Sequence, residues 1–146
     1  MARFAAGGLT TAGSTTLPIA ALVGSASCKP KIYEIGVFNT TSTAVALKLV
    51  RMTTAGTPGA TLTSERVSDP EGPASLATLK NTYTSTGPTL TDLGFRCQLG
   101  AAIGSGFVWT FGADGLPVLV AANAAVGIVV ENGTGQACQV YFAWWE

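Results

Sequence analysis

The chain has 146 residues, of which 11% are charged, and its eight basic and eight acidic residues leave no net charge at pH 7. A chain of this length can bury one hydrophobic core, so we expect a single domain. The zero net charge and the scattered basic residues exclude the basic stripe that nucleic-acid-binding proteins carry.

The shortage of charge is the first indication of function. Ordinary globular domains have about 25% charged residues, whereas here Ala, Thr and Gly take their place and the mean hydropathy is +0.40. A protein with so few charges stays soluble most readily when much of its surface is buried in an assembly. The composition therefore predicts a protein that works by contacting other proteins.

At the N-terminus, residues 1–15 are expected to form an extended arm ahead of one domain at residues 16–146. The apolar run at 17–23 is short and contains Pro18, unlike the uniformly apolar core of a secretory signal, so we expect the arm to be retained. Because the chain has no long apolar run free of Gly and Pro, no transmembrane helix is expected and no membrane partner.

The next pattern along the chain lies on either side of residues 39–42, whose composition is typical of a turn. One antiparallel register places Ile35 opposite Leu47 on an apolar face and Glu34 opposite Lys48 on the other face. Because one register satisfies both faces, the pattern predicts a hairpin.

A second hairpin is predicted at the C-terminus, where residues 132–135 tolerate positive φ. There Ile128 would lie opposite Val140. Weaker strands are expected near residues 3–6, 16–23, 57–63, 74–79, 89–99, 105–111 and 115–121. No window shows helical periodicity, so the predicted fold is all-β: an antiparallel β-sandwich, jelly-roll-like, with the extended N-terminal arm.

Catalytic chemistry finds little support in the residues. The chain has no histidine, which removes the commonest general base and excludes Ser-His-Asp and Cys-His arrangements. Asp69 and Glu71 flank Pro70 in the most charged loop, where a glycosidase pair or a calcium site is conceivable, but neither has its full set of groups. We expect no enzyme activity, no cofactor and no metal.

Three cysteines, Cys28, Cys97 and Cys138, are widely spaced. An odd number at such spacing fits neither a disulfide framework nor a zinc site. We expect small buried side chains, with one bridge and one free thiol as the alternative.

The aromatic C-terminus is the most informative segment. Strand alternation sends Phe142 and Trp144 to one face and Tyr141 and Trp145 to the other. One face belongs to the core. The other is covered by the arm or a loop, forms a subunit contact, for which Trp and Tyr are favoured anchors, or stacks on a sugar. The candidate interface residues are Arg3, Phe4, Tyr141, Trp144 and Trp145.

Two segments, KIYEIGVFNTTSTAVALKLVRMTTAGTPG at 31–59 and IVVENGTGQACQVYFAWWE at 128–146, resemble small virion proteins of tailed bacteriophages, of the head decoration (cement) type. Together they cover roughly a third of the chain. The family has no catalytic motif to transfer. The resemblance implies a β-sandwich that binds the major capsid protein at subunit junctions on the expanded head and forms a homotrimer.

The expected location is therefore the capsid surface of a virion, after synthesis in the host cytoplasm. Two other functions stay open. One is a tail- or fibre-associated module of the virion, and the other is a secreted carbohydrate-binding module.

Overall fold

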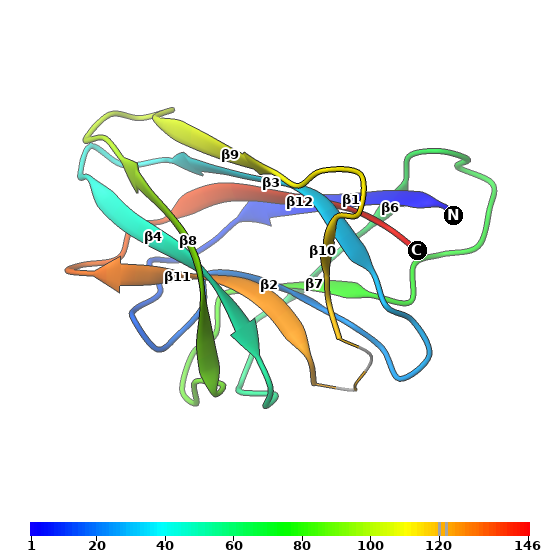
Figure 1. The fold of residues 1–146 in the computed structure, drawn as a ribbon. Helices are drawn as coiled ribbons and strands as arrows, with labels where there is room; N and C mark the ends of the chain where they lie inside the picture. Colours follow the sequence, from blue (N-terminus) through cyan, green and yellow to red (C-terminus); the bar gives the residue numbers. More distant parts are fainter. Residues whose placement is uncertain (120, 122) are drawn as a thin grey trace.

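The computed structural model describes every residue except Val120 and Ala122, and the regular structure of the described residues is entirely β. Two six-stranded sheets pack face to face (Figure 1). Sheet A contains β1 (Arg3–Leu9), β3 (Lys31–Asn39), β6 (Glu65–Arg66), β9 (Gly106–Thr110), β10 (Leu116–Pro117) and β12 (Cys138–Trp145). Sheet B contains β2 (Ala20–Val23), β4 (Val45–Met52), β5 (Thr61–Leu62), β7 (Thr78–Asn81), β8 (Leu90–Leu99) and β11 (Ala125–Asn132). The predicted antiparallel β-sandwich is confirmed.

The chain passes between the two sheets repeatedly. Sheet A has the order β10-β3-β12-β1-β6, with β9 paired to β3, and sheet B has the order β5-β7-β2-β11-β4-β8. The main core lies between the sheets and takes alternate residues from each strand, for instance Phe142 and Trp144 from β12 and Ile128 from β11. Alternation of side chains across each strand therefore separates the core from the outer faces.

The two predicted hairpins are wrong. β3 pairs with β12 and β9, whereas β4 pairs with β11 and β8. Ile35 and Leu47 are both buried in the core, but they enter it from opposite sheets. Glu34 accepts a hydrogen bond from Tyr141 rather than meeting Lys48. An apolar alternation fits a partner across the core as well as a partner in the same sheet, so it does not select between them.

The two strands of the second predicted hairpin, β11 and β12, also lie in different sheets. β11 pairs with β2 and β4, and β12 pairs with β1 and β3. The segments that join β3 to β4 and β11 to β12 are therefore arches that cross from one sheet to the other, and not hairpin turns (Figure 1).

The expected extended arm is also wrong. Residues 3–9 form β1, which lies between β12 and β6 and pairs with β12 from Arg3–Trp145 to Leu9–Gln139. Its inward side chains, Phe4 and Ala6, belong to the core. The alternation of apolar and small residues in β1 suits a strand beside β12, and residues 3–9 belong to the sandwich domain.

The other expected strands are present with shorter or shifted bounds, as β2, β5, β7, β8 and β9. Of the strand expected at 115–121, the structure forms β10 over Leu116–Pro117, and Val120 lies outside the described residues. Over the described chain there is no helix long and apolar enough to span a membrane.

Part of the outer face of sheet B is covered by the chain itself. Tyr83, in the segment between β7 and β8, is buried against Met52, Ala125 and Val129 in a second apolar cluster. Burial raises the pKa of Tyr83 to about 12. The outer face of sheet B is therefore partly closed to a partner. The outer face of sheet A and the side of the sandwich on which β8 and β9 lie remain exposed.

Candidate interaction surfaces

The aromatic residues of β12 divide between the core and the outer face, as alternation predicts. Trp144 is fully buried, lies with its ring 6.1 Å from that of Phe4, and donates from Nε1 to Glu146 at 3.0 Å. Tyr141 and Trp145 lie half-buried on the outer face of sheet A. The prediction of Phe4 and Trp144 as interface residues is wrong, because the core encloses their side chains.

Tyr141 is held tightly on that outer face. Its ring covers Gly36 and leaves no room there for a side chain, and it stacks beside Phe38 with ring centroids 6.4 Å apart. Its hydroxyl donates to Glu34 at 2.7 Å. Burial, together with the neighbouring Glu34 carboxylate, raises the pKa of Tyr141 to about 12. A ring fixed in this way forms part of the outer surface of sheet A.

Arg3 and Trp145 are brought together by the register of β1 and β12. With Met1 they line a shallow pocket of about 370 Å³, and the ring of Tyr33 lies 5.2 Å from that of Trp145. Two of the predicted interface residues thus share one surface at the end of the sandwich where both chain termini lie (Figure 1). Tyr141 lies further along the same strand.

Glu146 fixes the chain end beside this pocket. Its carboxylate accepts hydrogen bonds from the backbone N–H groups of Leu76 and Ala77, both at 2.9 Å, and from the hydroxyl of Ser75. Backbone bonds join Ala2 and Glu146 in both directions. The two termini and the 75–77 segment therefore form one connected unit.

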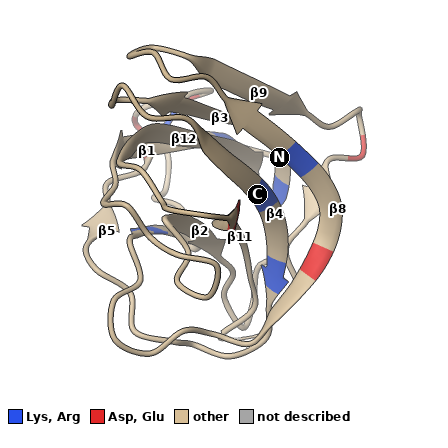
Figure 2. Ribbon diagram, turned by 90° about the vertical axis from the view of Figure 1, so that its left-hand side faces the viewer, with Lys and Arg blue, Asp and Glu red and all other residues tan. Residues whose placement is uncertain are grey.

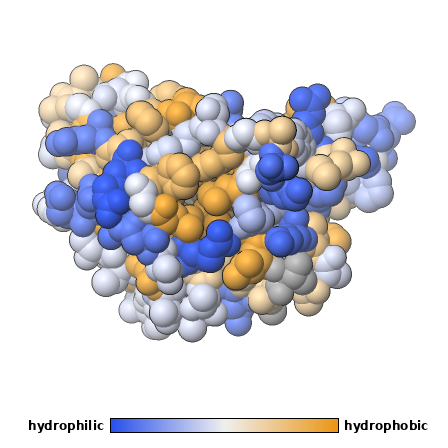
Figure 3. Space-filling model, in the orientation of Figure 1, coloured by the Kyte–Doolittle hydropathy of each residue, from blue (hydrophilic) through white to orange (hydrophobic). Residues whose placement is uncertain are grey.

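An exposed apolar surface on the β8–β9 side comes from residues that sequence analysis did not select. Phe95 and Phe107 are each 41% exposed, and Ile103, in the loop between β8 and β9, is 76% exposed. We call these three residues the open-edge patch. Val108, which follows Phe107 on β9, is 40% exposed but lies opposite Gly36 on the outer face of sheet A. Figure 3 shows apolar side chains gathered in the middle of the face on which β8 and β9 lie. The sequence contains one signal for this surface: residues 97–113 carry no charge.

Aromatic contacts support the open-edge patch from beneath. The ring of Phe95 packs edge-on against that of Phe111, with ring centroids 5.3 Å apart, and the ring of Phe107 packs edge-on against that of Trp109, with centroids 5.2 Å apart. Such edge-to-face pairs hold aromatic rings in defined positions. The patch is therefore a supported surface, with rings held in place where a partner would contact them.

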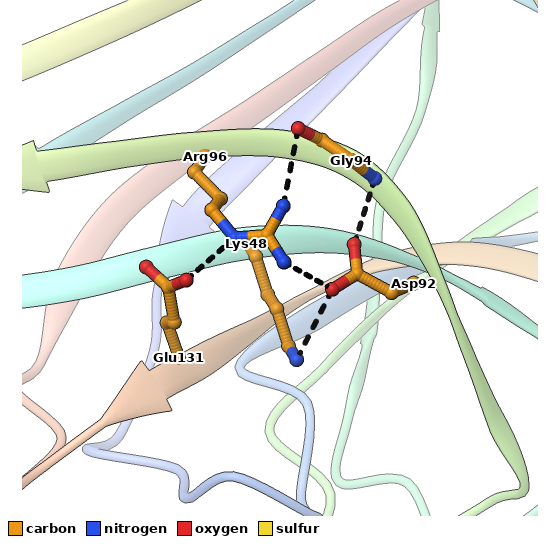
Figure 4. Close-up of polar contacts among 5 residues, drawn as sticks. All are labelled: Lys48, Asp92, Gly94, Arg96 and Glu131. Atoms are coloured by element: carbon orange, nitrogen blue, oxygen red, sulfur yellow. Dashed lines mark hydrogen bonds and ion pairs between the residues drawn. The ribbon is translucent and has the colours of Figure 1, made fainter.

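Four charged residues of sheet B form one network beside this patch (Figure 4). Arg96 contacts Asp92 at 2.6 Å and Glu131 at 2.5 Å, and Lys48 reaches Asp92 at 3.4 Å. Asp92 also accepts a hydrogen bond from the backbone N–H of Gly94 at 2.7 Å, where β8 bulges away from β4 and φ is 84°. Lys48, Asp92 and Arg96 lie on β4 and β8 (Figure 2) and Glu131 lies on β11, whereas β9 and β12 carry no charge. The network stabilises the bulge that presents Phe95.

We expect Asp92→Asn to lower the melting temperature near neutral pH but not in strong acid. The Gly94 N–H, and then Arg96 and Lys48, lower the pKa of Asp92 below its ordinary value. A lowered pKa contributes stability that is present above the unfolded-state value of about 3.9 and is lost as the pH falls through the folded-state value. Thermal unfolding measured from neutral to acidic pH should show the gap between wild type and variant closing.

The matched control for this experiment is Asp114→Asn, on an exposed turn. It should leave the melting temperature nearly unchanged at every pH. A constant gap for Asp92→Asn from neutral pH to strong acid would contradict the role assigned to its charge.

The three cysteines are free thiols. Cys97 and Cys138 are buried and Cys28 is half-buried; all three are described and none is bridged. Burial raises the pKa of Cys97 to about 12 and that of Cys138 to about 11, so both stay as unreactive thiols. Asp69 lies 3.8 Å from Arg66. Among the residues that the structure describes, no three metal-ligating side chains come together.

Neither a family model, nor a curated protein, nor a solved structure matches the chain. Function therefore has to be inferred from its own residues and surfaces, of which the open-edge patch and the Arg3–Trp145 surface are the candidates.

Proposed function

We propose that the chain is a non-catalytic structural protein of a virion, a head decoration (cement) protein of a tailed bacteriophage. It binds the major capsid protein on the outer surface of the head at subunit junctions and stabilises the expanded shell. The observation that carries the proposal is the open-edge patch on a surface poor in charge. The resemblance of residues 31–59 and 128–146 to such proteins points to the virion.

The open-edge patch suits a protein partner. Exposed apolar side chains gathered on one face of a folded domain mark a place of protein contact, and here they lie beside strand edges that have main-chain groups to offer. With few charges available, apolar burial and main-chain hydrogen bonds supply the binding. Repetition of the same contact over a shell adds avidity, so each contact can be modest.

The test is binding to heads that lack this protein, prepared from the phage whose genome encodes the chain. We expect saturable co-sedimentation that changes little between low and high salt, because screening acts on charges. Ile103→Asp, which puts a charge in the patch, should weaken binding about tenfold or more. Val67→Asp makes the same change at an exposed apolar residue away from the patch and should bind like wild type.

Failure to co-sediment with heads would contradict the cement assignment. Strong release by salt would show that the contact depends on charges, against the mechanism proposed. Binding to isolated tails or to a polysaccharide, with none to heads, would replace the assignment with one of the two alternative functions.

A further inference from the structure

β9 is an edge strand without the usual protection. Natural sheets protect their edges by short strands, charged residues, proline or bulges. β8 has a bulge at Gly94 flanked by Asp92 and Arg96. β5, β6 and β10 are two residues long, and β10 contains Pro117. β9 has five residues in unbroken register with β3, with no charge, no proline and no bulge.

The free edge of β9 is formed by the main chain of Gly106, Val108 and Thr110. Bonds at the two ends of the ladder, from Asn39 N to Ser105 O at 2.7 Å and from Phe111 N to Tyr33 O at 2.9 Å, show which residues bond to β3. Hydrogen-bonded positions alternate along an antiparallel pair, so the three even-numbered residues point their N–H and C=O groups away from β3. No described strand pairs on that side (Figure 1).

We infer that β9 pairs antiparallel with β9 of a second copy of this chain, about a two-fold axis at Val108. In that register Val108 lies opposite its own copy and Gly106 lies opposite Thr110. Each strand presents three outward N–H and three outward C=O groups, and this register bonds all of them. Sheet A of one copy then continues into sheet A of the other.

The side chains favour a second copy as the occupant. A two-fold axis brings identical residues together, so a charged strand would repel itself, but no charge lies between Arg96 and Asp114. The same register sets Phe107 of one copy beside Trp109 of the other, an aromatic cross-strand pair. Phe107, 41% exposed in a single chain, gains a partner there.

This pairing shares Phe107 and the edge of β9 with the surface proposed to bind the shell, and leaves the edge of β8 free. It uses Phe107 and Val108 and leaves Phe95 and Ile103 of the open-edge patch available to the shell. It also differs from the homotrimer that the family resemblance implies, because a two-fold contact closes on itself as a dimer.

The test is the mass of the full chain in solution by light scattering, over a wide range of concentration. We expect a dimer of twice 14.8 kDa that dissociates on dilution. Val108→Lys and Val108→Glu each place like charges opposite one another at the axis and should weaken self-association roughly a hundredfold. Mixing the two variants should restore a dimer, because Lys then faces Glu. Val108→Thr is the matched control and should dimerise like wild type.

Val108→Pro adds a test of the main-chain bonds. The N–H at 108 points away from β3, so proline removes an intermolecular donor and no bond within the chain. Circular dichroism should show all the variants folded. A monomer at every concentration, a trimer, or a Lys–Glu mixture that stays monomeric would overturn the inference. An Ile103→Asp variant that still dimerises would separate this contact from the proposed function, because Ile103 lies outside β9 and takes no part in the pairing.

Discussion

Trp144→Ala is expected to lower the free energy of unfolding by about 3–5 kcal/mol, the range typical of a large aromatic side chain lost from a core. Trp144 is among the largest fully buried side chains and lies against Phe4 of the neighbouring strand. Its loss leaves a cavity between the sheets and removes the Nε1 donor to Glu146. Urea denaturation followed by circular dichroism measures the change.

Trp145→Ala is the matched control, since the next residue lies half-buried on the outer face. We expect a loss of about 1 kcal/mol, since only part of that ring leaves contact with Tyr33 and Arg3. Equal losses from the two tryptophans would contradict the assignment of one to the core and the other to the surface.

Asn39→Ala is expected to cost about 2–4 kcal/mol of stability, because it leaves buried polar groups without partners. Its side-chain amide donates to the backbone oxygens of Thr43 at 2.6 Å and Gly100 at 3.1 Å and accepts from the N–H of Thr41 at 3.0 Å. These bonds hold the arch from β3 to β4 and tie it to the β8–β9 loop. Urea denaturation of the wild type and the variant measures this change in the free energy of unfolding.

Asn132→Ala provides the comparison in the other arch. Asn132 is exposed at the end of β11, where the segment that leads to β12 begins. Its substitution should change stability by no more than about 0.5 kcal/mol. If Asn39→Ala and Asn132→Ala lower the free energy of unfolding equally, the side-chain bonds of Asn39 do not hold the arch between β3 and β4.

The position of the two chain termini allows the binding experiments to use tagged protein. Both termini lie together at one end of the sandwich, joined by backbone bonds between Ala2 and Glu146, and the loop between β8 and β9 lies toward the other end (Figure 1). A tag at either terminus therefore stays away from the open-edge patch and from the free side of β9. Shell binding and self-association can be measured on the same tagged protein.

The sequence pointed to Tyr141 and to the Arg3–Trp145 surface, but not to the open-edge patch. Alternation along β12 correctly placed Tyr141 and Trp145 on the face opposite to Trp144. It did not show that Phe4 enters the core, because this depends on β1 lying beside β12. The open-edge patch was missed because Phe95 and Phe107 look like ordinary strand residues until it is known that both strands lie at sheet edges.

The sequence by itself determined the all-β class, the antiparallel sandwich and most of the core-facing residues of β3, β4, β11 and β12, because side chains alternate with a period of two in every strand. Only the tertiary structure decided which strands pair. Main-chain hydrogen bonds are the same for every partner, and the apolar faces of β3 and β4 match across the core as well as they would side by side. The arches, the place of β1 and the unprotected edge of β9 follow from that choice, which the chain makes through contacts far apart in sequence.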